Sequence, residues 1–325
     1  MAPITATVYN AFTSPSAQGN PAAVIVLDSP DHQSAAVQDG QDFPCALFPP
    51  DAQLQSIGTQ INLPMTAFVL PLPGGSCAEY AVRWFNATNE GPLCGHATLA
   101  MSGHLFNMVA RPPPTFRYLT RFHGVISASQ HQNPLGDGKL VGIEFPELTN
   151  LPPVPRGSET WAQLKSLFEE ATSSRWQGPG EPLGVYKQDQ FLLIEFSPEL
   201  DLAGVQIEPQ NLSSLKSYVY IFQISAQSSE QIHSRVLHSF PGHADEDIAT
   251  GSAHRAIIPH ALGNPETRAR LEKYHPQHEG DALRVAQQSR KGGELVVQWL
   301  REDKSVRIMG RVDPVGAKTV EASEN

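Results

Sequence analysis

The sequence has no apolar stretch long enough to cross a bilayer, and it has no cluster of basic residues. A membrane-spanning helix needs roughly 18–20 consecutive apolar residues, and no such run occurs among the 325 residues. Lys and Arg number 23 against 33 Asp and Glu, which gives a formal net charge of −10. A chain this acidic is poorly suited to a phosphate backbone. We therefore expect neither membrane insertion nor nucleic acid as a partner.

Cysteine is scarce and metal-binding motifs are missing. The three cysteines show no CxxC spacing, which argues against a disulfide scaffold or a zinc ribbon. The 12 histidines show no HExxH or similar ligand spacing, and no dinucleotide or phosphate loop occurs. Residues 1–6 lack the basic and apolar regions of a secretory signal. These absences predict a cytoplasmic protein that needs no metal and no organic cofactor.

Proline, by contrast, is abundant, and its frequency predicts short elements. The chain holds 28 prolines, about 9% of its residues against a usual ~5%. Runs of β-branched and aromatic residues predict strands at 22–27, 66–70, 80–85, 191–196, 218–224 and 294–300. Apolar spacing and a Pro-Pro start predict helices at 51–60 and 161–171. This mixture is typical of the α+β class.

The chain contains an internal duplication. The segment CGHATLA in the first half resembles TGSAHRA in the second half. Gly95 and Gly251 are separated by the same 156 residues as His104 and His260. Each copy also follows an arginine and an acidic residue: Arg83 and Glu90 in the first, Arg235 and Asp247 in the second. A shared offset close to half the chain length predicts two similar domains.

In each copy a glycine turn leads into small and then apolar residues. This pattern predicts helices that begin at Gly95 and Gly251, each with an alanine face against a sheet. The N-terminus of a helix presents N–H groups and the positive end of the dipole, which suit a carboxylate or an enolate. Two such helix starts facing one cleft would form an anion-holding, proton-transferring site. Ordinary strand-to-helix turns are the alternative interpretation.

Six short motifs follow one another between residues 19 and 295, within a resemblance that runs from residue 7 to about 310. They are GNPAAV at 19–24, NL with TAFV at 62–69, RWF at 83–85, CGHATLA at 94–100, ED with TGSAH at 246–254, and GGEL at 292–295. In this order they resemble the phenazine-biosynthesis PhzF-like family of the diaminopimelate-epimerase and proline-racemase superfamily. The resemblance implies cofactor-free proton-transfer chemistry and two pseudo-symmetric epimerase-like domains. Each would be a curled, barrel-like antiparallel sheet around a central helix, with the active site in the cleft between the domains.

We place the two domains at residues 1–128 and 129–310, and we expect residues 311–325 to return to the first domain. The resemblance assigns the family's histidine to His96 and its aspartate to Asp247. The catalytic cysteine of the epimerase branch falls on Cys94, but its partner falls on Thr250, so a two-thiol racemase is not supported. The expected catalytic residues are Asp247, His96 and Cys94, and the expected substrate-binding residues are Gly95, Gly251, Ser252, Met65 and Thr250.

Met65 departs from the family pattern. Family members carry an Asn-Leu-Ser-Glu-Thr segment whose glutamate is the general acid/base, whereas residues 62–66 here read NLPMT. A thioether cannot take or give a proton, so the usual mechanism cannot run unchanged. We expect Met65 to make the pocket more apolar.

Each candidate also has a structural interpretation. Asp247 is either a general acid or a cap for the following helix. His96 is either a proton shuttle or a histidine that satisfies the core. Cys94 is either a reactive thiol at a helix start or a small buried hydrophobic residue. We expect His104 and His260 to be structural.

Three functions follow from these residues. The first is a cofactor-independent isomerase that transfers a proton on a small-molecule metabolite of specialised (secondary) metabolism. The second is acid-catalysed rearrangement or cyclisation of an epoxide in an apolar metabolite, for which Met65 is suited because it cannot trap a cation. The third is a catalytically inactive binding protein, against which the intact glycine motifs argue. The sequence leaves open whether the chain is a monomer or a homodimer.

Overall fold

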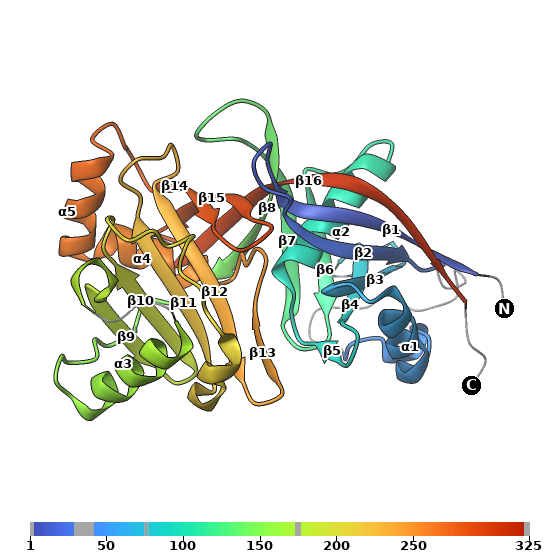
Figure 1. Ribbon diagram of the computed structural model, residues 1–325. Helices are drawn as coiled ribbons and strands as arrows, with labels where there is room; N and C mark the ends of the chain where they lie inside the picture. Colours follow the sequence, from blue (N-terminus) through green and yellow to red (C-terminus); the bar gives the residue numbers. More distant parts are fainter. Residues whose placement is uncertain (1–2, 29–41, 75, 77, 173–176, 322–325) are drawn as a thin grey trace. The chain divides into compact units, whose positions relative to one another are not determined.

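The computed structural model describes residues 3–28, 42–74, 76, 78–172 and 177–321. Its strands are β1 (Ile4–Thr13), β2 (Asn20–Val26), β3 (Met65–Pro71), β4 (Tyr80–Phe85), β5 (Glu90–Gly91), β6 (Thr115–Thr120), β7 (Gly124–Gln132), β8 (Lys139–Pro146), β9 (Gly184–Gln188), β10 (Phe191–Phe196), β11 (Ser217–Ile224), β12 (Ile232–Phe240), β13 (His243–Glu246), β14 (Ala282–Gln287), β15 (Gly293–Leu300) and β16 (Ser305–Val320). The α-helices are α1 (Asp51–Ile61), α2 (Gly95–Met108), α3 (Glu159–Ala171), α4 (His254–Gly263) and α5 (Pro265–Tyr274). Short 3₁₀ helices lie at Cys45–Leu47, Gly178–Gly180 and Pro209–Leu215. Figure 1 shows their order along the chain.

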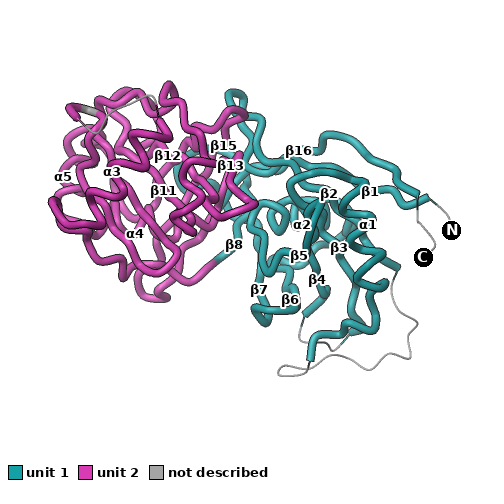
Figure 2. Tube along the Cα trace, turned by 60° about the horizontal axis from the view of Figure 1, so that its bottom comes forward, with its two compact units in different colours: residues 1–144, 309–325 teal, residues 145–308 magenta. Residues whose placement is uncertain are grey.

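The chain divides into two compact units, coloured teal and magenta in Figure 2. Unit 1 comprises residues 1–144 and 309–325, and unit 2 comprises residues 145–308. The expected boundary after residue 128 is too early. It would cut through β7, which pairs with β6 from Gly124 to Ser129 and with β8 from Ala128 to Gln132. Strand β7 and most of β8 therefore belong to unit 1.

Unit 1 contains a closed ring of eight strands in the order β1-β2-β3-β4-β6-β7-β8-β16, which returns to β1. The β1–β16 ladder runs from Ile4↔Val320 to Thr13↔Arg311 and closes the ring. The ring confirms the barrel-like fold. The sheet is mixed, however, and not antiparallel as expected, because β2–β3 and β4–β6 are parallel pairs. Parallel neighbours need a crossover connection, and α1 and α2 provide the two crossovers.

Helix α2 is the central helix of unit 1. Every residue from His96 to Phe106 is buried, and a helix that is buried all round belongs to the core. Gly103 is required for this packing. A Cβ atom built there would lie only 2.7 Å from Cγ1 of Val312 in β16, so the helix meets the strand without space for a side chain.

Unit 2 repeats the strand directions of unit 1. The pairs β10–β11 and β12–β14 are parallel, and β11–β12, β12–β13 and β14–β15 are antiparallel. The same sequence of directions joins β2 through β7 in unit 1. The two halves therefore have the same topology, with α4 in the place of α2.

Proline in the middle of α4 has a local compensation. Pro259 has no N–H to bond the carbonyl of Arg255, four residues earlier. The backbone N–H of Leu148 donates to that carbonyl instead, at 3.0 Å.

No helix in the described part of the chain combines the length and the apolar character that spanning a membrane requires.

Candidate active site

A hairpin in each unit carries a buried arginine paired with a glutamate. In unit 1, Nε and Nη2 of Arg83 donate to the two carboxylate oxygens of Glu90 at 2.8 and 2.7 Å. In unit 2, Nε and Nη2 of Arg235 donate to the two carboxylate oxygens of Glu246 at 2.6 and 2.8 Å. The two bidentate pairs hold β5 against β4 and β13 against β12. They are the equivalent contacts of the two halves.

This equivalence corrects the expected pairing of Glu90 with Asp247. Glu90 matches Glu246, at the same offset as Gly95 and Gly251, and Asp247 therefore matches Gly91. In unit 1 that position has no side chain, and Met65 lies beside it. A Cβ atom built on Gly91 would lie 3.4 Å from Cε of Met65. Of the matched residues Gly91 and Asp247, only Asp247 in unit 2 has a carboxylate.

The start of α2 places Cys94 and His96 in contact. Cys94 is the extended N-cap residue, and its Sγ lies 3.4 Å from Nδ1 of His96. Both residues are buried, at 7% and 8% exposure. The first intrahelical bond runs from the N–H of Thr98 to the carbonyl of Cys94. The N–H groups of Gly95, His96 and Ala97 thus precede it, as at any helix start that can receive an anion.

Asp247 lies in the loop between β13 and α4, where it contacts Thr250. The Thr250 hydroxyl donates to Oδ2 of Asp247 at 2.5 Å. The buried amide of Gln287 accepts from the N–H of Thr250 at 2.7 Å and donates to the carbonyl of Asp247 at 2.8 Å. Ser289 donates to the carbonyl of Ile248 at 2.6 Å. The loop that carries the carboxylate is thus fixed at both ends.

The second helix begins three residues later than expected. Gly251, Ser252 and Ala253 form a tight turn, because the N–H of His254 bonds to the carbonyl of Gly251 at 3.0 Å and the N–H of Arg255 to that of Ser252 at 3.3 Å. These are i→i+3 bonds, so the turn is of the 3₁₀ type and α4 starts at His254. Gly251 is buried, whereas Thr250 and Ser252 are partly exposed.

His254 holds this turn from inside the protein, a role that was not expected from the sequence. It is fully buried, with Nδ1 2.8 Å from the carbonyl of Thr250 and Nε2 3.2 Å from the hydroxyl of Ser234. In α2 the matching residue is Thr98, whose hydroxyl donates to the carbonyl of Cys94 at 2.6 Å. Each helix therefore starts with a side chain that bonds a carbonyl four residues back. The signal for this function was the 156-residue offset itself, applied to the fifth residue of each motif.

Burial of His254 makes the stability of the protein depend on pH. Burial lowers the pKa of His254 to about 4, from an ordinary value of 6.5. The unfolded chain binds the proton first as pH falls, so the free energy of unfolding should decrease from pH 6.5 towards pH 4, by about 3 kcal/mol. Urea titrations at several pH values measure this slope. The variant His254→Gln cannot titrate and should have a shallower slope; equal slopes in both proteins would contradict the assignment.

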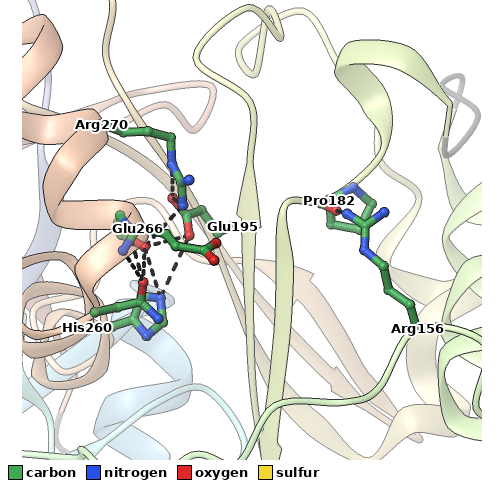
Figure 3. Close-up of polar contacts among 8 residues, drawn as sticks. Arg156, Pro182, Glu195, His260, Glu266 and Arg270 are labelled. Carbon is green, nitrogen blue, oxygen red and sulfur yellow. Dashed lines mark hydrogen bonds and ion pairs between the residues drawn. The ribbon is translucent and has the colours of Figure 1, made fainter.

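His104 and His260 lie in contacts that hold each helix to its surroundings. Nδ1 of His104 lies 3.0 Å from the hydroxyl of Tyr9. Figure 3 shows His260 and Arg270 converging on Glu195. Glu195 is 1% exposed, and Arg270 binds its Oε1 at 2.7 Å while Nε2 of His260 lies 3.7 Å from its Oε2. A buried carboxylate needs such partners, so this network has a structural explanation.

Comparison with known proteins agrees with the fold and the motifs. The family model "phenazine biosynthesis-like protein" (PhzC-PhzF) matches residues 9–315. A human phenazine biosynthesis-like domain-containing protein is 27% identical, over 93% of this chain and 94% of its own. An uncharacterised isomerase of Halalkalibacterium halodurans is 29% identical, over 78% of this chain and 80% of its own.

The solved structures give the same answer for the fold. A PhzF-family protein of Enterococcus faecalis superposes with a TM-score of 0.71 at 23% identity and covers 98% of this chain and 100% of its own. A probable proline racemase from Agrobacterium radiobacter superposes with a TM-score of 0.52 at 13% identity. The motifs, the repeated topology and the match over nearly the whole length agree, and the chain belongs to the phenazine biosynthesis-like (PhzC-PhzF) family.

Proposed function

We propose that the chain is an isomerase that moves a proton on a small carboxylate-bearing metabolite, with Asp247 as the main acid/base group. The observation that carries this proposal is the contact at 2.5 Å between the Thr250 hydroxyl and Oδ2 of Asp247. This hydroxyl holds one carboxylate oxygen and so limits the rotation of the Asp247 side chain. Gln287 and Ser289 fix the loop, so the carboxylate is held in place before any substrate binds.

The relatives support the same class of reaction. Relatives from Halalkalibacterium halodurans and Pseudomonas aeruginosa are named as isomerases. Both align over more than three quarters of this chain. The names of these relatives thus support the class of reaction, whereas the substrate and its place in specialised metabolism are part of the proposal.

In the proposed reaction, one group removes a proton from a carbon atom and a second delivers a proton to another carbon. The electrons of the broken C–H bond pass into an enolate or dienolate and return to form the new C–H bond. The N–H groups at the start of α2 and in the turn at Gly251 are suited to the oxyanion. Asp247 and His96 exchange the protons, and Cys94 lies close enough to His96 to orient it.

A second candidate function is acid-catalysed rearrangement of an epoxide or alkene. The surroundings of Met65 favour this reaction. Met65 lies beside Gly91, and Gly91 is the unit 1 residue that matches Asp247, so unit 1 has no carboxylate at that position. In this reaction a protonated acid opens the electrophile, and the cation rearranges and loses a proton. An apolar thioether does not capture the cation as a carboxylate would.

A scan in deuterated water tests the main proposal. The protein is incubated in D₂O with a library of small carboxylic acids and epoxides, and the mixtures are read by mass spectrometry and proton NMR. We expect at least one compound to acquire carbon-bound deuterium or to convert to an isomer. Asp281→Asn, which changes an aspartate of a surface ion pair with Arg301, is the matched control for Asp247→Asn.

The outcomes separate the functions. Carbon-bound label that requires Asp247 and persists in Asp281→Asn supports the isomerase. Isomerisation of an epoxide without carbon-bound label supports the rearrangement. Tight binding of a compound that remains chemically unchanged and unlabelled contradicts both and identifies a binding protein.

A further inference from the structure

The β12–β13 hairpin of unit 2 presents three ligand-type side chains on one face. The strands are joined by the two-residue turn Pro241-Gly242, with Gly242 in the left-handed region at φ +78°. His238 lies directly opposite Asp245 in the antiparallel register, and His243 is two residues before Asp245. Residues that are opposite, or two apart on one strand, point to the same side of a sheet. The backbone therefore brings the three groups together.

The ligand atoms lie close to the spacing that a transition metal requires. Nδ1 of His238 is 3.0 Å and Nε2 of His243 is 3.8 Å from Oδ1 of Asp245. One ligand atom from each residue lies within 4.8 Å of the other two. Tetrahedral zinc, with bonds of about 2.0–2.2 Å, places its ligand atoms roughly 3.3–3.6 Å apart. The His238–Asp245 distance is slightly shorter and the His243–Asp245 distance slightly longer than this, and both His243 and Asp245 are exposed side chains that can adjust.

The least exposed member of the group is oriented but incompletely satisfied. His238 has an exposed side-chain fraction of 22%, against 60% for His243 and 55% for Asp245. Its ring meets the ring of Tyr218 edge-on at 5.5 Å, which limits its rotation. Within the described residues its Nδ1 is buried and has no aligned hydrogen-bond partner, although the Asp245 carboxylate is near. An ion between them would bond both atoms.

We propose that His238, His243 and Asp245 bind a divalent transition-metal ion, with Zn²⁺ as the preferred class, and that water completes the coordination. Two imidazoles and one carboxylate suit zinc, copper or nickel, whereas magnesium and calcium prefer oxygen ligands alone. None of the three residues is among the proposed acid/base residues, and the site stands whether or not the proposed function is correct. Bound metal would cross-link the two strands of the hairpin.

Calorimetric titration of the full chain with zinc chloride tests the site. All proteins carry Cys45→Ser, because the exposed thiol of Cys45 is a competing zinc ligand. We expect one equivalent of zinc to bind, with affinity at least tenfold weaker in His243→Ala and in Asp245→Asn. His123→Ala removes an exposed histidine in unit 1 and should bind as the parent does.

Cobalt provides a second readout that does not depend on the heat signal. Four-coordinate Co²⁺ absorbs visible light far more strongly than hydrated Co²⁺, so titration should produce a visible band that zinc removes and excess magnesium does not. His243 is the exposed first residue of β13, and its replacement leaves the core unchanged, as a circular dichroism melt can verify. Zinc binding that is absent, or that is equally strong in both ligand variants, overturns the proposal.

Discussion

Asp247→Asn should lower turnover of the substrate by roughly 10²–10⁴, the usual contribution of general acid–base catalysis. Asparagine has nearly the same shape and can still accept the Thr250 hydroxyl bond, but it cannot exchange a proton in the useful pH range. The measurement is kcat on the compound identified by deuterium labelling, with Asp281→Asn as the control. Near-normal turnover in Asp247→Asn would show that the acid is another residue.

Variants at the start of α2 then distinguish the two kinds of chemistry. His96→Ala should also reduce turnover severely, because it removes the imidazole beside Cys94. A large loss in Cys94→Ala would indicate a thiol base and an epimerase-like reaction. A small loss would favour acid-only isomerisation or rearrangement. If Asp247→Asn and His96→Ala both keep full activity, the proposed site is wrong.

Glu246→Gln should destabilise unit 2 by about 3 kcal/mol, because breaking a buried ion pair costs roughly 3–5 kcal/mol. Arg235 is 6% exposed and would keep its charge without its carboxylate partner. Its other bonds, to the carbonyls of Leu202 and Val205, do not neutralise that charge. We place the loss at the lower end because the Glu246 side chain is 21% exposed. Urea denaturation of both proteins gives the difference.

Glu90→Gln in unit 1 is the matched comparison, and its effect should be smaller, about 1–2 kcal/mol. Arg83 would keep a second carboxylate, since Nη1 also donates to Oδ1 of Asp51 at 2.8 Å. Asp51 is largely exposed and therefore a weaker partner. A larger loss in Glu90→Gln than in Glu246→Gln would contradict this account of the two arginines.

Much of the secondary structure could be predicted because it is encoded locally. The alternating and β-branched runs at 80–85, 191–196 and 218–224 coincide with β4, β10 and β11 to within one residue. The helices predicted at 51–60 and 161–171 coincide with α1 and most of α3. Sheet direction was wrong because parallel pairing depends on which strands become neighbours, and no local pattern records that choice. The return of the last residues to the first domain was expected, but the long strand β16 was not, because its partner β1 is about 300 residues away in sequence.

The matching of positions between the two halves could be predicted from the sequence, but the contacts within the site could not. The shared offset found the two glycine motifs. The acidic residues, however, were matched only by their place before each motif, as Glu90 with Asp247, because sequence alone does not show which carboxylate an arginine binds. The Arg235–Glu246 pair settles the alignment. The proximity of His238 and Asp245 could not be predicted for a related reason: they are seven positions apart in sequence, and only the hairpin places them opposite each other.

The way β16 closes the ring of unit 1 determines the order in which a ribosome can complete the two halves. Unit 2 is one continuous stretch of chain, whereas unit 1 needs residues from 309 onward. During synthesis unit 2 can therefore complete its strand pairing first. Until β16 emerges, β1 and β8 each have one unpaired edge, because β16 is the strand that pairs with both. Open strand edges recruit other chains. The nascent first half is thus the stage most exposed to aggregation, and the last strand to emerge ends that exposure.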